Sequence, residues 1–304
     1  MRERPGAGWR RISAVGCAAR SLTGVALVVG VALALAPAGG VARAAAMDLK
    51  IGAVAYEGEF GSDDKTRVWA VPFELSLNRS TSRFTITVPY VGIDNVGNLT
   101  WTADGPLVLG VRGPGKPAYQ VAAPGVSRRG LGDIVLSQET YLIHPGKGKT
   151  PLIGLLLDYK WATADEKQGL GTGKGDYSAG LEYLQPLGKI FQISAKGAYR
   201  WMGDPQGIDL KDGIKYSGGF AFVTNREVWR FQYEKVPAFL EKAPIFNAAG
   251  TPIGIEEVRD RESVRVDLIV RKKAGGTTRL GVSHGLNRNS EQLGLMLILS
   301  SGEQ

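Results

Sequence analysis

Short segments with two alternating kinds of side chain decide the fold, and the clearest of them is FQISAKGAYRW at residues 191–201. Its odd positions, from Phe191 to Trp201, are mostly apolar, whereas its even positions include Gln192, Lys196 and Arg200. A period of two places these two sets on opposite faces of a β-strand. Residues 69–77, WAVPFELSL, repeat the pattern.

The same alternation recurs along the chain and predicts an all-β architecture of about twelve strands. No later segment has a sustained period of 3.6 residues or the length of an apolar transmembrane helix. The predicted strands begin near Leu49, Trp69, Phe84, Asp133, Leu152, Tyr177, Phe191, Ile214, Val228, Val264, Leu280 and Leu293.

The connections between these strands alternate in length. Short ones fall at residues 78–83, 144–151, 185–189, 224–227 and 272–279, and longer ones at 57–67, 92–132, 162–176, 202–213 and 237–262. Only 287–292 breaks the pattern. An even number of strands with short turns at the end that holds both termini predicts a transmembrane antiparallel β-barrel of the outer-membrane type. Residues 107–111 in the longest loop either add an outer hairpin or fold inward as a constriction.

The polarity of the strand faces favours a membrane barrel over a secreted sandwich or lipocalin-like barrel, which remains the alternative. A membrane barrel turns its apolar faces to lipid and its polar faces to the lumen. The predicted lumen-lining residues are Lys50, Glu74, Asp133, Glu139, Asp158, Lys160, Glu182, Lys196, Arg200, Lys215, Arg230, Glu234, Arg265, Asp267 and Arg271.

These lumen charges are unevenly distributed along the chain. The fourth to sixth strands carry mostly acids and the seventh to tenth mostly bases. In a closed sheet, this order predicts an acidic wall that faces a basic one. The alternative is that the charges pair to fill a narrow interior, because burying them unpaired is costly.

Aromatic residues collect near the strand ends, as in the two girdles of a membrane barrel. The girdle at the long loops is predicted to contain Tyr56, Trp69, Tyr90, Tyr159, Trp161, Tyr177, Tyr199, Trp201 and Tyr216. The girdle at the short turns is predicted to contain Phe84, Tyr183, Phe191, Phe222 and Trp229.

Residues 1–46 have the layout of a bacterial signal peptide, which would leave residues 47–304 as the barrel. An arginine-rich start precedes an apolar run at residues 22–36 and small residues around Ala44. An uncleaved anchor is the alternative, although the run is shorter than the roughly 20 apolar residues of a membrane span. Cys17, the only cysteine, lies in this segment. The predicted location is the outer membrane, after secretion through the inner membrane.

The net charge of +8 does not indicate nucleic-acid binding. Residues 1–44 carry six arginines and one acid, so the remaining chain has a net charge of only +3 and no basic stripe. The predicted partners are outer-membrane lipid, small-molecule solutes and the barrel assembly machinery, with no nucleic acid.

No catalytic, cofactor or metal site is predicted. The glycine-rich residues 169–175 imitate a phosphate loop, but Gln168 and Gly175 break the motif. Ser283 and His284 are neighbours on a predicted strand, so they face opposite sides and do not form a nucleophile and base pair.

Residues 155–187, LLLDYKWATADEKQGLGTGKGDYSAGLEYLQPL, resemble the outer-membrane protein family named for the meta-cleavage pathway of phenol degradation. Gly130-Leu131-Gly132-Asp133 resembles the start of an earlier strand in that family, whereas Ala162 stands where the family proline is expected. The C-terminal Ser-Gly-Glu-Gln also differs from the usual aromatic end of such barrels. The resemblance implies an outer-membrane barrel that moves small hydrophobic or aromatic compounds.

The predicted function is therefore a passive outer-membrane channel or facilitator, and not an enzyme. Two alternatives stay open: a structural or surface-interaction barrel with a closed lumen, and a lipid-modifying outer-membrane enzyme.

Overall fold

The computed structural model describes residues 46–59, 65–94, 99–102, 105–108, 127–143, 150–204, 210–238, 242–246, 252–257, 260–272 and 275–301. The predicted signal peptide, apart from Ala46, lies outside these residues, as do residues 109–111 of the predicted constriction. The signal peptide therefore stays a prediction.

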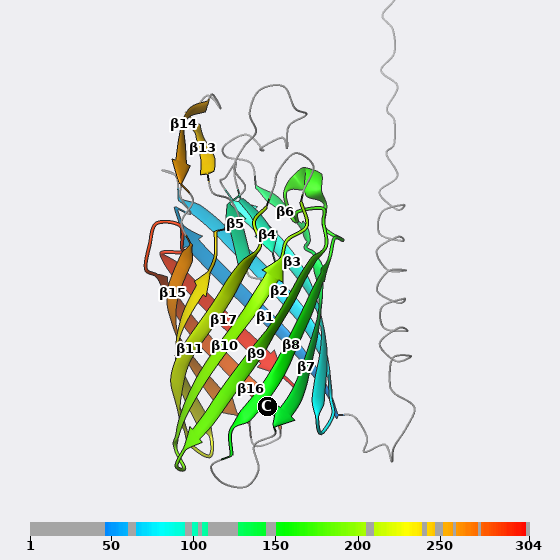
Figure 1. The fold of residues 1–304 in the computed structure, drawn as a ribbon, viewed down its shortest axis with the longest axis vertical. Helices are drawn as coiled ribbons and strands as arrows, with labels where there is room; N and C mark the ends of the chain where they lie inside the picture. Colours follow the sequence, from blue (N-terminus) through cyan, green and yellow to red (C-terminus); the bar gives the residue numbers. More distant parts are fainter. Residues whose placement is uncertain are drawn as a thin grey trace, which may run out of the picture. The chain divides into compact units, whose positions relative to one another are not determined.

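The strands form one closed antiparallel barrel (Figure 1). Around the barrel they follow the order β2, β1, β17, β16, β15, β12, β11, β10, β9, β8, β7 and β3, and a pairing of β3 with β2 closes the sheet. The short β6 pairs with the other end of β3 and precedes β7 in the chain, so β6 and β7 together act as one strand. The barrel is therefore twelve-stranded, as the alternation predicts.

The bounds of the barrel strands agree closely with the predicted starts. They are β1 Ala46–Gly58, β2 Thr66–Asn78, β3 Ser82–Asp94, β6 Arg128–Leu131, β7 Ile134–Ile143, β8 Leu152–Trp161, β9 Asp176–Leu187, β10 Phe191–Trp201, β11 Gly213–Val223, β12 Glu227–Val236, β15 Arg261–Arg271, β16 Thr277–Gly285 and β17 Leu293–Ser300. The short turns that follow β2, β9 and β11 and the end of the last strand lie at one end of the barrel (Figure 1).

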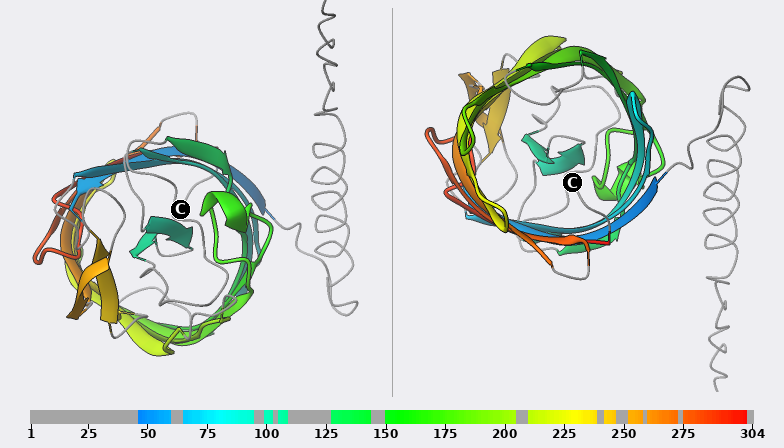
Figure 2. Two further views of the ribbon diagram at one scale, coloured as in Figure 1. Left: turned by 90° about the horizontal axis from the view of Figure 1, so that it is seen from above. Right: turned by 90° about the horizontal axis from the view of Figure 1, so that it is seen from below.

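Two hairpins arise from the long connections. One is β4 (Leu99–Thr102) with β5 (Gly105–Val108), and the other is β13 (Lys242–Phe246) with β14 (Pro252–Glu257). In both end-on views the β4–β5 hairpin is drawn inside the ring of barrel strands (Figure 2). This position favours the inward alternative for the longest loop.

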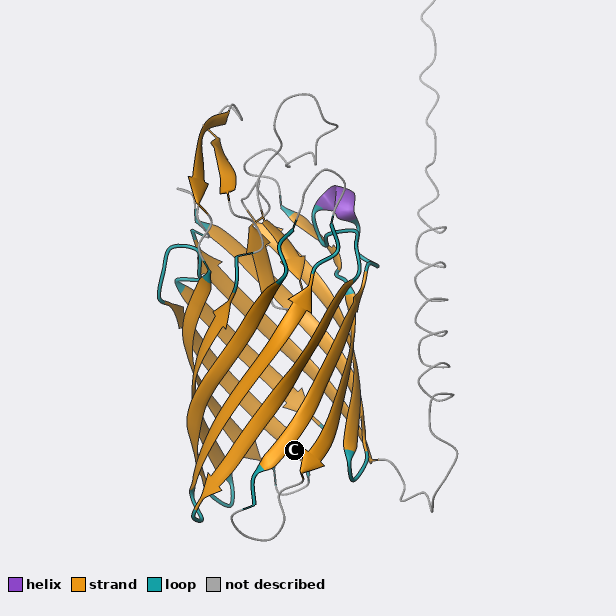
Figure 3. Cartoon of the chain, in the orientation of Figure 1, coloured by secondary structure: helices purple, strands orange, loops and turns teal. Residues whose placement is uncertain are grey.

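Strands make up almost all of the regular structure (Figure 3). The helix among the described residues is the 3-10 turn η1 at Glu166–Gln168. No helix in this part of the chain is long and apolar enough to cross a membrane.

The outward face of the barrel is an apolar surface. Leu49 is 60% exposed, Leu181 55% and Val282 51%, and they are accompanied by many other large apolar side chains. The neighbouring positions on the same strands are largely polar and buried, such as Asp48 and Ser283. Because an apolar surface of this extent is unsuited to water, it fits the lipid-facing side of a membrane barrel.

The aromatic residues at the strand ends lie mostly on this outward face. Tyr177, Tyr199 and Trp201 are exposed near the long loops, and Phe222 and Trp229 near the short turns. The prediction is wrong for Tyr56, which is paired across the strands with Val68 and packs against the buried inner cluster of Val68, Ala70, Val91 and Ile93. Tyr56 lies an even number of residues from Lys50, so the period of two places both on the inner face.

Candidate functional site

The inner face of the barrel is the candidate site, and strand register decides which residues it holds. Residues directly opposite each other in an antiparallel pair lie on the same face of the sheet. Cross-strand partners can therefore be followed from strand to strand to identify the inner face, which is opposite to the face with the exposed apolar residues. The inner face holds Lys50, Glu74, Glu139, Asp158, Lys160, Glu182, Lys196, Arg200, Lys215, Arg230, Glu234, Arg265, Asp267 and Arg271. Asp133 lies between β6 and β7 and contacts Lys160.

A buried ionic network joins β8, β9 and β10 near the long loops. The Lys160 ammonium lies 3.1 Å from Oδ2 of Asp133 and 3.0 Å from Oδ2 of Asp176. Arg200 donates a hydrogen bond of 2.7 Å to the same Asp176 oxygen. Lys160 and Asp133 are each only 1% exposed, and Asp176 is 2% exposed. These charges are therefore part of the barrel wall rather than of a water-filled path.

The same network fixes the connection between β8 and β9. Oδ1 of Asp133 accepts hydrogen bonds of 3.0 Å from the backbone N–H groups of Thr163 and Ala164. Lys160 also donates to the hydroxyl of Thr172, which is completely buried. The segment that imitates a phosphate loop is thus folded onto the wall, where its Thr172 hydroxyl accepts a hydrogen bond from Lys160.

One glycine allows this loop to approach the wall. A Cβ atom on Gly171 would lie 2.6 Å from Oδ2 of Asp133, which is closer than ordinary van der Waals contact. Leu170, beside it, is 1% exposed and lies close to Gly130 of β6. The glycine-rich sequence therefore serves close packing of the loop against β6 and Asp133.

Most of the remaining lumen charges are paired with close neighbours instead of forming opposed walls. The pairs are Lys50–Glu74 at 3.4 Å, Arg83–Glu139 at 3.6 Å, Asp158–Lys215 at 3.8 Å and Glu182–Lys196 at 2.9 Å. The partners are of opposite sign in all four pairs, and in three of them they lie on adjacent strands. Local pairing therefore cancels much of the field that the order of charges along the sequence predicts.

Among the inner-face charges that were not predicted as lumen residues are Arg83, Asp176 and Arg279. All three belong to strands in the structure, but each falls just before a predicted strand start. Extending the alternation by one residue from Phe84, Tyr177 or Leu280 would have placed each of them on an inner face.

The basic residues that remain least neutralised lie on β12, β15 and β16. Arg265 and Arg279 both approach the single carboxylate of Asp267, at 3.4 and 2.7 Å. Arg230 is directly opposite Asp267 on the neighbouring strand. Arg271 donates instead to the backbone oxygen of Thr224 at the turn before β12.

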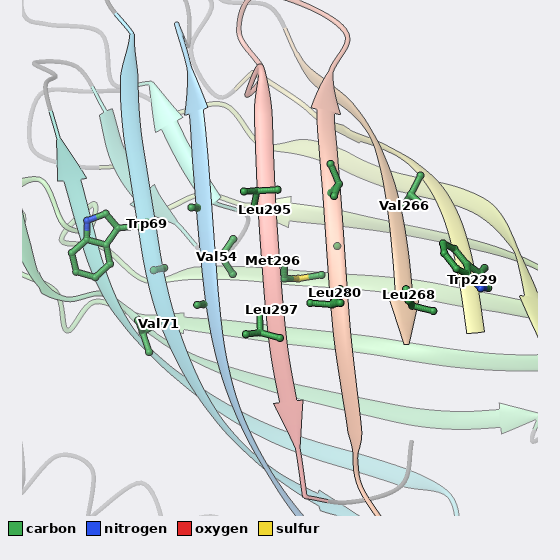
Figure 4. A pocket seen from close by; sticks show the side chains of 15 residues that line it. Val54, Trp69, Val71, Trp229, Val266, Leu268, Leu280, Leu295, Met296 and Leu297 are labelled. Carbon is green, nitrogen blue, oxygen red and sulfur yellow. The ribbon is translucent and has the colours of Figure 1, made fainter. Parts of the chain in front are cut away.

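An apolar groove of about 590 Å³ lies on the outside of the barrel (Figure 4). It is bordered by the neighbouring strands β2, β1, β17, β16, β15 and β12. Trp69 and Trp229 flank it, and the small Ala53 and Ala55 of β1 lower its floor. Most of the bordering side chains belong to the lipid-facing set, whereas Val54, Ala70 and Met296 belong to the inner face. The groove is therefore mainly a feature of the membrane surface.

Ser283 and His284 do not form a nucleophile and base pair. Ser283 faces inward and donates to Glu291 at 2.9 Å, whereas His284 is exposed on the outward face. No group of three or more His, Cys, Asp or Glu in the described ranges is placed to hold a metal ion. His144, the other histidine, lies outside these ranges.

Comparison with solved structures identifies the fold. The chain is similar to an outer membrane channel from Pseudomonas putida F1, with a TM-score of 0.60 and 11% identity over 88% of this chain and 99% of the other. Weaker matches are the transport unit of the autotransporter AIDA-I from Escherichia coli (TM-score 0.47, 11% identity, 91% and 96% coverage) and the P. putida toluene transporter TodX (0.40, 11%, 90% and 92%). No family model and no curated protein matches the chain. The first of these similarities shows that the chain has the fold of an outer-membrane barrel.

Proposed function

We propose that this protein is a passive outer-membrane channel or facilitator for small molecules. The observation that carries the proposal is a closed barrel with an apolar outward face and an inner face rich in charged residues. That arrangement suits lipid outside and water and polar groups inside. Residues 1–46 act as the cleaved signal peptide in this proposal, residues 47–304 form the barrel, and the barrel assembly machinery inserts it.

We further propose that the transported compounds are small and hydrophobic or aromatic, and that the protein belongs to the family named for phenol degradation. The sequence resemblance at residues 155–187 supports both points.

A second function is favoured by the β4–β5 hairpin, which is drawn within the ring of strands (Figure 2). A barrel filled by this hairpin and by paired wall charges would be closed, and its loops would carry a structural or surface-interaction role. Ion conduction separates the two functions, because a closed barrel carries no steady current.

Single-channel recording should show discrete conductance steps when the purified mature protein is inserted in planar lipid bilayers. The current is expected to be small, because the lumen charges are mostly paired and the β4–β5 hairpin narrows the ring. Its ion selectivity should be weak, because neighbouring inner-face charges of opposite sign cancel. A protein that inserts but never conducts would support the closed barrel instead.

Lys167→Cys should react with an impermeant thiol reagent added to intact cells, because Lys167 is exposed in the connection between β8 and β9 at the long-loop end. Arg226→Cys is the matched control. It is equally exposed, but it lies in the short turn between β11 and β12 at the opposite end, and should react only after cell rupture. Cys17 does not compete if the signal peptide is removed. The reverse labelling pattern would invert the proposed orientation.

A further inference from the structure

Three arginines on the inner face lie around a single carboxylate, and two of them contact it. Arg279 donates to Oδ2 of Asp267 over 2.7 Å, and Nε of Arg265 lies 3.4 Å from the same oxygen. Arg230 is directly opposite Asp267. The positive charges of Arg265 and Arg279 act on it, and the negative charges of Asp267 and Glu182 partly offset them. The cluster of Arg230, Arg265, Arg279 and Asp267, the arginine cluster, therefore has an excess of two positive charges.

The hydrogen-bonding capacity of the arginine cluster is incompletely used. Among the described residues, Arg230 has no hydrogen-bond or ion-pair partner, and the Nε groups of Arg265 and Arg279 have no hydrogen-bond partner. The remaining contact of Arg265 is a hydrogen bond of 2.9 Å to the neutral side chain of Gln232. Three guanidinium groups with one carboxylate among them leave an uncompensated positive charge in a partly dry interior. This charge is costly, so a further anion would be stabilised there.

The arginines, and not the aspartate, face the open side of the cluster. The Asp267 side chain is completely buried, whereas the side chains of Arg265 and Arg279 are 31% and 21% exposed. Arg230 is likewise half-buried. A solute on the inner face would therefore meet three guanidinium groups, with the carboxylate that holds them underneath.

Apolar residues border the arginine cluster on both sides. Ile269 is directly opposite Arg279 on β15, and it packs with Val228 and Ala221. On β17, the half-buried Ile298 is directly opposite Arg279, and Met296 is directly opposite Gly281. A ligand held by the arginines would thus place its remaining atoms against hydrocarbon.

We propose that the arginine cluster and the bordering Met296 and Ile298 bind the carboxylate of a small apolar carboxylic acid during its passage. Planar guanidinium forks match the two oxygens of a carboxylate, and the neighbouring side chains suit a hydrocarbon or aromatic body. This inference rests on the proposed channel function and narrows its solutes to compounds with one anionic and one apolar part.

Benzoate is a suitable test compound, and benzyl alcohol is its neutral counterpart. Benzoate should reduce the single-channel current of the unaltered protein in a saturable way, whereas benzyl alcohol should not. Arg230→Gln should weaken this block by about tenfold or more, because it removes a charge-assisted contact. Arg230 is the best position to change, because no described protein group depends on it.

Lys50→Gln is the matched control, because it removes one inner-face positive charge whose partners, Asp48 and Glu74, lie outside the cluster. It should leave the benzoate block within about twofold, since its charge is already neutralised. Equal losses in the two variants, or an unchanged block in Arg230→Gln, would show a general charge effect and overturn the site. Inorganic phosphate that blocks as well as benzoate, with the same dependence on Arg230, would overturn the carboxylate assignment.

A separate measurement distinguishes failure of this site from failure of the channel function. Benzoate binding to the purified protein in detergent can be followed by isothermal titration, with no need for conduction. If the protein binds benzoate and Arg230→Gln weakens that binding, but the protein does not conduct, the result would support the site and overturn the channel function. Conduction without benzoate binding would support the channel and overturn the site.

Discussion

Lys160→Met should lower the free energy of unfolding of the barrel by about 3–5 kcal/mol. The Lys160 ammonium lies between the carboxylates of Asp133 and Asp176, and all three side chains are almost completely buried. Without the lysine, Asp133 loses its ion-pair partner and only Arg200 still neutralises Asp176. Methionine fills similar space but cannot compensate a buried carboxylate. Urea unfolding in lipid vesicles, followed by tryptophan fluorescence, measures the loss.

Lys196→Met is the matched control for this substitution. Lys196 also lies on the inner face and pairs with Glu182 at 2.9 Å, but its side chain is 41% exposed. Water can solvate the glutamate once the lysine is gone, so we expect a loss of about 0–1 kcal/mol. If the two substitutions cost the same, then the Lys160 network is solvated in the folded protein and does not hold the loop to the wall.

The contrast between these two lysines shows what could be predicted from the sequence. A period of two assigns each residue to a face, and it placed both Lys160 and Lys196 on the inner face. The same alternation also predicted nearly all of the strand starts. Each face assignment depends only on local backbone geometry, so it survives errors of a few residues in the strand bounds.

Burial on the inner face could not be predicted in the same way. Lys160 is buried because residues 162–175 fold back onto it, and this contact depends on Gly171 and Thr172 in a connection without periodicity. The pairing of Arg279 with Asp267 likewise depends on the register between β15 and β16, which a period of two does not fix. Opposed charged walls were expected because charge was counted along the chain, whereas the energy depends on distances across strands.

Gly219→Ala should impair the barrel far more than Gly218→Ala, although the two glycines are adjacent on β11. Gly219 is directly opposite Gln232 of β12, and a Cβ atom there would overlap the backbone oxygen of Phe231. Backbone in a paired strand cannot move aside as a side chain can, so the added methyl should cost about 1–3 kcal/mol or more. At Gly218 the nearest atom would be 3.7 Å away, in ordinary contact.

The two alanine variants have the same composition and lie in the same strand, so strand propensity does not separate them. Refolding yield into lipid vesicles and the urea midpoint should both fall for Gly219→Ala and stay close to the unaltered values for Gly218→Ala. The backbone of β12 can come close to β11 at this point because Gly219, which lies on the inner face, has no side chain. Equal tolerance of both substitutions would mean that β11 and β12 are farther apart here, or that the register of this pair is shifted by one residue.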